Sequence, residues 1–355
     1  MSYEIRTRMD RRLIQILVII CCVVAAVTVS YGIMNPPEPV QKPFFTSSET
    51  ADIFVDYDGY TVSFSVPVNL TPQAVSGLGK TTTFLTSGSE TESQISGYYR
   101  RMVGDPDQTR MLHLLYLGFS MAKERLKLSD DEFVDLVVRY VQSLEYVTVH
   151  SMVKYPVETV LDQAGDCDDR ALLLTGILSE AGYDVCLFSF DAEAHAAAGI
   201  RVAPGYDFQN TGYAYIETTG PAYIGDVPLL EGNISVREST PEVVAIGNGT
   251  RWYGAIRETQ AILDMRTDAK SELSRLAELI RVQTGRVDML KARLPYYQGM
   301  NKIDYEMKHD EYVHAVGLLN KYVSQYNRNA DISNYIAEHA GDRKTVYRVL
   351  FPDSA

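Results

Sequence analysis

A cysteine in acidic, glycine-containing surroundings is the residue of this chain best placed to do chemistry. Cys167 lies in the run GDCDD, residues 165–169, directly before the apolar stretch Ala171–Leu178. This pattern predicts that Cys167 is in the first turn of a helix, where unpaired backbone N–H groups and the positive end of the dipole favour a thiolate. We therefore expect a reactive thiol with a pKa well below the value of about 8.5 for free cysteine, although the neighbouring aspartates oppose this shift.

A thiolate nucleophile needs a base, and the base needs a partner that orients it. His195 opens a predicted strand, residues 195–202, and a second predicted strand covers residues 212–218. If the two strands pair across a loop centred near residues 206 and 207, His195 lies opposite position 218, one residue from Glu217. Asp207, the rival carboxylate, would lie at the tip of the loop. We therefore expect Glu217 to orient the imidazole.

Two cysteines lie beyond the N-terminal apolar segment, and their spacing argues against a disulfide. The predicted helix over residues 168–181 runs about 20 Å before the chain turns back into the predicted strand Val185–Phe190. The Cα atoms of Cys167 and Cys186 are then about 10 Å or more apart, beyond the limit of about 7 Å for a disulfide. We expect Cys167 to be a free thiol and Cys186, on an apolar strand, to be inert.

The region around the cysteine needs elements that position it, and the sequence predicts several. Residues 35–105 combine a Pro- and Ser-rich tether with a β-hairpin, because apolar and polar residues alternate over Asp52–Val66 around Asp58-Gly59. Residues 106–254 hold the cysteine and its predicted partners. They begin with an amphipathic helix, and a capping box at residues 129–132 starts the next one.

Residues 255–355 predict two long helices that fold back as a hairpin, because apolar residues recur every seven positions on both sides of Pro295–Gly299. In the first helix these positions are Leu273, Ile280, Val287 and Leu294, beside Ile262, Ala269, Leu276 and Leu290. In the second they are Tyr305, Tyr312, Leu319 and Tyr326, beside Val316 and Val323. We interpret both sets as helix-packing seams. A ligand surface is the alternative for the tyrosines, and the helical hairpin is a candidate site for a protein partner.

The N-terminal region predicts a membrane anchor. Leu13–Ile33 contains no charge and is long enough to span a bilayer core of about 30 Å, and four arginines precede it. The basic flank favours a cytoplasmic N-terminus and a body outside the cell. Residues 1–34 would then be a cytoplasmic stub and a single transmembrane helix, with a cleaved signal peptide as the alternative. Glycosylation-type triplets beginning at Asn69, Asn233 and Asn248 follow this segment.

The order cysteine, histidine, carboxylate, on a helix start and two adjacent strands, resembles the transglutaminase-like group of the papain-type fold. The resemblance covers residues 133–224, about a quarter of the chain, and is closest to archaeal and bacterial extracytoplasmic members. Its segments are YVQSL (140–144), YPVET (155–159), GDCDD (165–169), GYDV (182–185), HAAAGI (195–200) and YIETT (215–219). It implies an α+β fold in which the helix bearing Cys167 packs on an antiparallel sheet. It also implies a cysteine protease or a transglutaminase-type acyltransferase.

Two departures from the family pattern concern the substrate more than the nucleophile. Many members follow the histidine with a tryptophan, but the only tryptophan here is Trp252. Many also use aspartate as the third residue, where this chain has Glu217. Glutamate can orient an imidazole equally well, so the expected set of Cys167, His195 and Glu217 remains.

The mechanism implied by this resemblance is acyl transfer on a protein or peptide substrate at the cell surface. Cys167 would attack an amide carbonyl, and His195 would protonate the leaving amine. Water would then resolve the thioester (hydrolysis), or a lysine amine would (cross-linking). The oxyanion would be bound by the backbone N–H of Cys167 and one side chain, for which Gln163 is the candidate.

Two other interpretations stay open. Asp166, Asp168 and Asp169 offer hard oxygen ligands of the kind that bind calcium, and some bacterial relatives of the group use carboxylates in this way; no other cofactor is expected. The chain could instead be an inactive envelope scaffold beside a partner-binding helical hairpin. The net charge of −13, without a basic run after the anchor flank, excludes nucleic acid as a partner.

Overall fold

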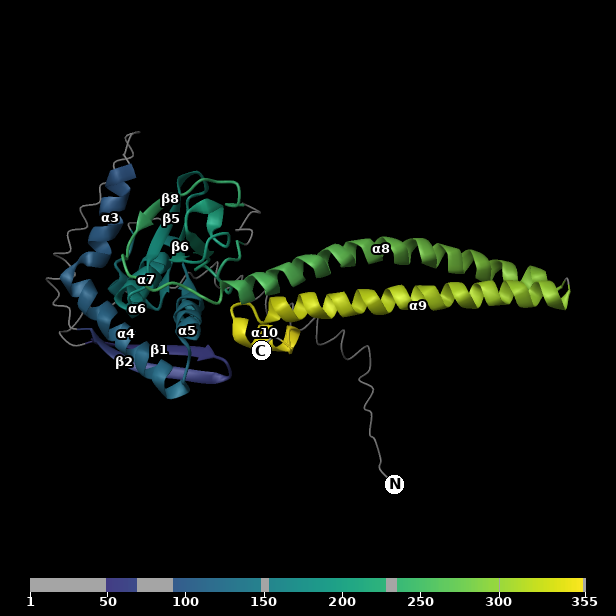
Figure 1. Ribbon diagram of the computed structural model, residues 1–355, viewed down its shortest axis with the longest axis horizontal. Coiled ribbons are helices and arrows are strands. Elements are labelled where there is room, and N and C mark those ends of the chain that lie inside the picture. Colours follow the sequence, from purple (N-terminus) through teal and green to yellow (C-terminus); the bar gives the residue numbers. More distant parts are fainter. Residues whose placement is uncertain (1–48, 69–91, 148–152, 228–234, 300, 354–355) are drawn as a thin grey trace, which may run out of the picture. The chain divides into compact units, whose positions relative to one another are not determined.

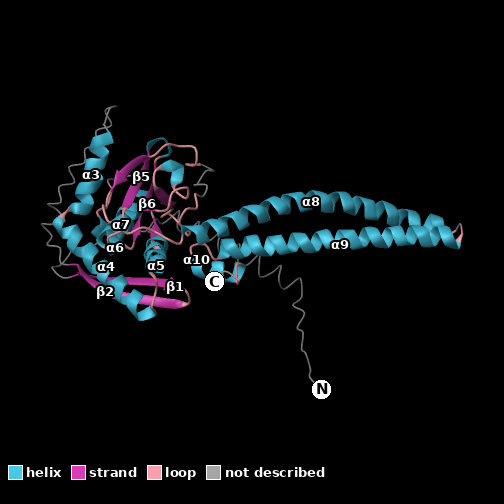
Figure 2. Ribbon diagram, in the orientation of Figure 1, coloured by secondary structure: helices cyan, strands magenta, loops and turns pink. Residues whose placement is uncertain are grey.

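The computed structural model describes residues 49–68, 92–147, 153–227, 235–299 and 301–353. The predicted anchor and the triplets at Asn69 and Asn233 lie outside these residues. In the described part of the chain, no helix combines the length and the apolar character needed to cross a bilayer. Residues 47–355 form one structural unit of the α+β class, with an antiparallel four-stranded sheet and a long pair of C-terminal helices (Figures 1 and 2).

The predicted β-hairpin is confirmed. Strand β1 (Glu49–Tyr57) pairs antiparallel with β2 (Tyr60–Val68). Asp58 and Gly59 form the two-residue turn with φ angles of 48° and 78°, and such positive values suit the twist of a tight hairpin. Alternate side chains on one face enter the main core, among them Ile53, Val55, Val62 and Val66.

Three helices follow the hairpin; the first was not predicted, and the second and third are the two helices that the sequence predicts. They are α3 (Glu92–Gly104), α4 (Pro106–Leu126) and α5 (Asp130–Ser143). The capping box at the start of α5 is confirmed, since the Ser129 hydroxyl accepts from the Glu132 backbone and the Glu132 carboxylate accepts from the Ser129 backbone. These helices, the hairpin and α7 share one core.

The helix and sheet that position the predicted site come next. A short helix, α6 (Pro156–Asp162), leads into α7 (Cys167–Glu180), and the two-residue strands β3 (Glu145–Tyr146) and β4 (Ala164–Gly165) pair in parallel just before α7. The sheet has the order β7-β6-β5-β8 and is antiparallel throughout. Its strands are β5 (Val185–Phe190), β6 (His195–Arg201), β7 (Tyr213–Ile216) and β8 (Glu242–Ala245). Strand β8 was not predicted from the sequence.

The two faces of this sheet have different surroundings. One face shares the main core with α7. The other face carries a separate aromatic cluster formed by Phe188, Phe190, Tyr213 and Tyr215, with Phe208 packed against it. Strands β6 and β7 are antiparallel, so β6 begins at the same end of the sheet at which β7 ends. The first residue of β6 and the residues after β7 therefore lie close together.

The pairing of β6 with β7 differs by one residue from the predicted register. Ala198 lies opposite Ile216, whereas the prediction placed it opposite Tyr215. The prediction assumed a symmetrical loop, but residues 202–212 include a short 3-10 turn (Phe208–Asn210) with two positive-φ residues. Strand β7 ends at Ile216, so Glu217 directly follows the ladder.

The C-terminal pair consists of α8 (Ile256–Gln298) and α9 (Lys302–Glu338), followed by a short helix that was not predicted, α10 (Arg343–Leu350). The seam on α8 is confirmed in part: Ile262, Ala269, Leu276, Val287 and Leu290 are buried, together with Gln283, whereas Leu273, Ile280 and Leu294 are only half-buried. Gln283 was not predicted; its side chain donates to the carbonyl of Ala315 on α9 at 2.8 Å. Val323 was assigned to the seam wrongly, because it is 37% exposed.

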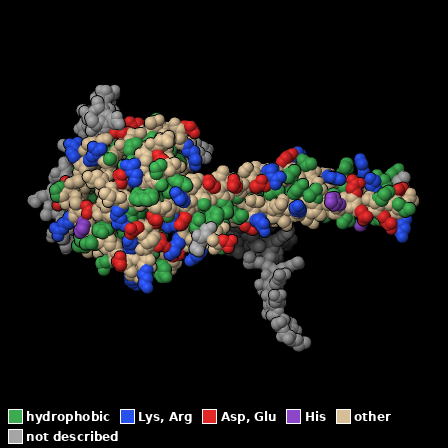
Figure 3. All heavy atoms as spheres, in the orientation of Figure 1, with side chains coloured by type: hydrophobic (Ala, Val, Ile, Leu, Met, Phe, Trp, Pro, Cys, Tyr) green, Lys and Arg blue, Asp and Glu red, His purple; other side chains and the backbone are tan. Residues whose placement is uncertain are grey.

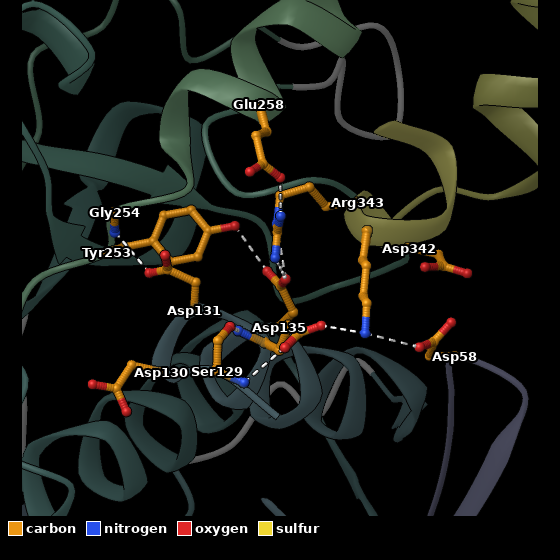
Figure 4. A network of polar contacts seen from close by, with 12 residues as sticks. Asp58, Ser129, Asp130, Asp131, Asp135, Tyr253, Gly254, Glu258, Asp342 and Arg343 are labelled. Carbon is orange, nitrogen blue, oxygen red and sulfur yellow. Dashed lines mark hydrogen bonds and ion pairs between the residues drawn. The ribbon is translucent and has the colours of Figure 1, made fainter. Parts of the chain in front are cut away.

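A buried ion network joins the C-terminal helices to α5 (Figure 4). The guanidinium of Arg343 donates to Oδ2 of Asp135 at 2.8 and 3.0 Å and also pairs with Glu258 on α8. Tyr253 donates to the other oxygen of Asp135 at 2.9 Å. Nearby, Lys344 pairs with Asp58 at the hairpin turn at 3.3 Å. Space-filling spheres show charged side chains of both signs along the helical pair (Figure 3).

Candidate active site

Cys167 is the first residue of α7, as the sequence predicts. A capping box fixes this helix start, because Asp166 accepts from the backbone of Asp169 at 3.3 Å and Asp169 accepts from the backbone of Asp166 at 3.2 Å. Asp169 also accepts from the backbone N–H of Lys154 at 2.6 Å, which ties the preceding loop to the helix. The thiol is therefore attached to a backbone that is held from two sides.

The surroundings of the thiol oppose its ionisation. Cys167 is only 9% exposed, and its sulfur lies 3.5 Å from the Asp168 carboxylate, which also accepts from Tyr99 at 3.1 Å. Burial, and then the negative charge of Asp168, raise the pKa of Cys167 above its ordinary value, although the backbone N–H of Ala196 donates to the sulfur and acts in the opposite direction. The expected low pKa is therefore wrong for the resting site, because desolvation and a neighbouring carboxylate outweigh the helix terminus.

His195 begins β6 and is 8% exposed. Its Nε2 lies 3.0 Å from the hydroxyl of Tyr215 and 3.4 Å from Oε2 of Glu217. Its ring stacks on Phe190, with the centroids 6.2 Å apart. The next residue, Ala196, donates its N–H to the sulfur of Cys167. The thiol is thus beside the start of β6, the strand that His195 begins.

Glu217 follows the end of β7 and is 3% exposed. Its Oε1 accepts from the backbone N–H groups of Thr218 and Thr219, both at 2.9 Å, and from the Thr219 hydroxyl at 2.7 Å. Its Oε2 accepts from Tyr215 at 2.7 Å. Burial alone would raise its pKa, but the hydrogen bond and charge of His195 and the Thr219 donors lower the pKa of Glu217 to about 2. The carboxylate is therefore charged beside the imidazole.

Arg170 is a residue of this site that the sequence analysis missed. Its side chain is fully buried, and it donates to the carbonyls of Gly165 at 3.1 Å, Thr218 at 2.9 Å and Leu144. Gly165 precedes the Cys167 helix and Thr218 follows Glu217, so one guanidinium joins both segments. The available signal was a positive charge directly before the apolar stretch Ala171–Leu178.

Tyr215 was missed as well. Its signal was its place two residues before Glu217 in the predicted strand 212–218, since side chains two apart in a strand point to the same face. Gln142 on α5 adds a further fixed point, because its amide donates to the carbonyls of Glu217 at 2.8 Å and Ala222 at 3.0 Å. These contacts hold the segment after β7 from several sides.

Two predicted residues lie elsewhere. Gln163 ends α6, and its amide donates to the carbonyl of Val160 at 2.6 Å and to Tyr140 at 3.4 Å. The short contact to Val160 holds the amide against its own helix, so the structure does not place Gln163 as an oxyanion donor. Asp207 accepts from the backbone of Gly205 at 3.1 Å and Gly212 at 2.9 Å, and so closes the loop between β6 and β7.

The aspartates beside Cys167 do not form a calcium site in the structure. Among the residues that the structure describes, no three His, Cys, Asp or Glu side chains are arranged so that they could hold a metal ion. Asp166 and Asp169 cap the helix and Asp168 accepts from Tyr99, so these carboxylates already have protein donors.

Cys186 is a free thiol on β5, as is Cys167 on α7, and the expectation that they do not form a disulfide is confirmed. Cys186 is fully buried, and this burial raises its pKa well above the ordinary value. Comparison with known proteins assigns no family, since no family description, curated protein or solved structure matches the chain.

Proposed function

We propose that this chain is a membrane-anchored, extracytoplasmic protein of the transglutaminase-like group that transfers acyl groups at amide bonds of proteins or peptides. Cys167 is the nucleophile, His195 the base and Glu217 the group that orients the imidazole. One observation carries the proposal: the Nε2 side of His195 faces Tyr215 and the charged Glu217, while the adjacent backbone N–H of Ala196 contacts the Cys167 sulfur.

The order of the elements that carry the three residues also supports this proposal. A cysteine at the start of a helix, followed by an antiparallel sheet that carries the histidine and then the carboxylate, is the arrangement implied by the papain-type resemblance. The order of elements α7, β5, β6 and β7 supplies it here.

The geometry suggests how such a site would act from a protonated thiol. As the sulfur attacks the amide carbonyl, Nδ1 of His195 accepts the thiol proton, and the imidazolium formed is stabilised by Glu217. The C–N bond breaks, the amine leaves with that proton, and the acyl group remains as a thioester on Cys167. Water then attacks the thioester through the same base, or an amine does, and the thiol is restored.

The oxyanion of each tetrahedral intermediate needs donors close to the sulfur. The N–H groups of the first turn of α7 have no partner within the helix, so the backbone of Cys167 supplies one donor. Gln163 is not retained in this role because its amide is used locally.

The proposal is tested by trapping the acyl-enzyme. The full-length protein is mixed with a protein extract of the cell envelope, quenched in acid to preserve thioesters, and digested for mass spectrometry. An acyl peptide on Cys167, lost in Cys167→Ala, supports acyl transfer and identifies the substrate. If Cys167 carries no acyl group in the wild type while the protein is folded, the proposal is wrong.

One observation favours a non-enzymatic second candidate, the envelope scaffold. The surroundings of Cys167 hold the thiol protonated, and a scaffold needs no activated thiol. The helical pair would then bind the partner, and Tyr296, Ile303 and Met307 are exposed apolar side chains near its turn. The trapping experiment separates the two candidates, since only the enzyme forms a thioester.

A further inference from the structure

The hydroxyl of Tyr215 lies between the imidazole and the carboxylate of the site. It is 3.0 Å from Nε2 of His195 and 2.7 Å from Oε2 of Glu217, whereas the direct distance from Nε2 to Oε2 is 3.4 Å. An N–H···O hydrogen bond normally spans about 2.7 to 3.2 Å. The two short contacts therefore pass through the tyrosine, and the direct contact between histidine and glutamate is the weaker one.

The chemistry of the three groups fixes the direction of these hydrogen bonds. An ionised carboxylate only accepts, so the Tyr215 O–H donates to Glu217. The phenol has one proton, so its oxygen must then accept from His195, and Nε2 of the ring must carry a hydrogen. The neutral imidazole has one N–H, so Nδ1 keeps its lone pair and can accept the proton of the Cys167 thiol.

The ring of Tyr215 is held firmly enough to position its hydroxyl. Tyr215 is 1% exposed and packs in the aromatic cluster on the sheet face away from the main core. Its ring is stacked on Phe188, with the centroids 6.3 Å apart, and is tilted against Phe208 at 5.6 Å. This packing fixes the ring without using its hydroxyl, so the hydroxyl is free to serve the site.

We propose that Tyr215 is a positioning residue that selects the Nε2–H tautomer of His195 and connects the imidazole to Glu217 through its hydroxyl. This inference rests on the proposed function of the same site. The resemblance leads one to expect that the carboxylate orients the imidazole directly, whereas here the phenol of Tyr215 lies between the imidazole and the carboxylate.

The test compares Tyr215→Phe with a matched variant, Tyr213→Phe. Both remove one hydroxyl from β7; that of Tyr213 donates to Asp184 at 2.8 Å, away from the site. The ring nitrogens of His195 are observed by NMR in the full-length, ¹⁵N-histidine-labelled protein, with the signals assigned through His195→Gln. We expect a single Nε2–H tautomer in the wild type and in Tyr213→Phe, and a mixture of tautomers in Tyr215→Phe.

A kinetic readout accompanies the spectra. With p-nitrophenyl acetate as the acyl donor, Tyr215→Phe should acylate Cys167 about tenfold more slowly than the wild type, and Tyr213→Phe at the wild-type rate. The double variant Tyr215→Phe/Glu217→Gln should be acylated only slightly more slowly than Glu217→Gln alone. Both substitutions interrupt the same hydrogen-bonded link between the imidazole and the carboxylate.

The inference is overturned if Tyr215→Phe keeps the wild-type tautomer and acylation rate, since Glu217 then acts on the ring directly. A wild-type ring protonated on Nδ1 would overturn it too. Failure of the proposed function looks different: the wild type itself would not be acylated at Cys167, while the NMR comparison would still decide the role of Tyr215.

Discussion

Nη1 of Arg170 donates a hydrogen bond of 2.9 Å to the carbonyl oxygen of Thr218, the residue that follows Glu217. The same guanidinium binds the carbonyl of Gly165, two residues before Cys167. The distance between the proposed nucleophile and the carboxylate is therefore set by a side chain that belongs to neither, through rigid backbone contacts in the interior.

Replacing Arg170 should weaken the fold and the site together. Arg170→Met leaves the buried carbonyls of Gly165, Thr218 and Leu144 without this donor, and we expect a loss of about 3 kcal/mol or more in the free energy of unfolding. Arg281→Met, on the exposed face of α8, is the matched control and should change it by less than about 0.5 kcal/mol. Urea unfolding of both variants measures this. Equal stability of the two would show that the three carbonyl contacts do not hold the site.

The negative charge of Asp168 should oppose ionisation of the Cys167 thiol. Because this carboxylate is one cause of the raised pKa of Cys167, Asp168→Asn should lower that pKa and speed alkylation by iodoacetamide at neutral pH. The rate is measured against pH by mass spectrometry, with the buried Cys186 as the internal control that stays unlabelled in the folded protein. A slower reaction in Asp168→Asn would mean that the carboxylate activates the sulfur instead.

Glu217 and Asp207 should differ sharply in their effect on activity. Glu217→Gln keeps the size of the side chain but removes the counter-charge of the imidazolium, and by analogy with other triads acylation should fall by at least about a hundredfold. Asp207→Asn alters only a loop contact and should leave the rate unchanged. The acylation rate with p-nitrophenyl acetate ranks the two variants, and the opposite order would remove Glu217 from the site.

The stability of the protein should depend on pH through Glu217. Its pKa is lowered from 4.5 in an ordinary environment to about 2 in the fold, so its ionised form favours the folded state. This contribution, at most about 3 kcal/mol, is present above about pH 5 and is lost as the pH falls towards 2. The difference in unfolding free energy between the wild type and Glu217→Gln should therefore shrink over that interval. A constant difference would show that the group is not ionised in the fold.

Local sequence patterns predicted the elements of the site well, and tertiary contacts explain where they did not. Ser129 and Glu132, Asp58 and Gly59, and the start of α7 at Cys167 follow from capping and turn chemistry that acts over a few residues. Placing His195 near Glu217 needed only the pairing of adjacent strands, and a register error of one residue did not separate them.

Properties that depend on contacts between distant segments could not be predicted from local sequence patterns. The helix terminus predicted an acidic thiol at Cys167, but the burial that reverses this depends on elements far away in the sequence, including Tyr99 beside Asp168. Gln163 was the candidate oxyanion donor, yet its amide turns back to its own helix. From the sequence, Arg170 is expected to be a surface charge, because its acceptors, the carbonyls of Gly165 and Thr218, come from other segments.

The most direct test of the account is the pre-steady-state reaction of the full-length protein with p-nitrophenyl acetate. We expect a burst of p-nitrophenolate equal to the protein concentration, with an acetyl group on the peptide that contains Cys167. The burst should persist in Cys186→Ala, disappear in Cys167→Ala and be strongly slowed in His195→Gln. No burst from the folded wild type, or a burst that His195→Gln leaves unchanged, would contradict the claim that Cys167 and His195 act together in acyl transfer.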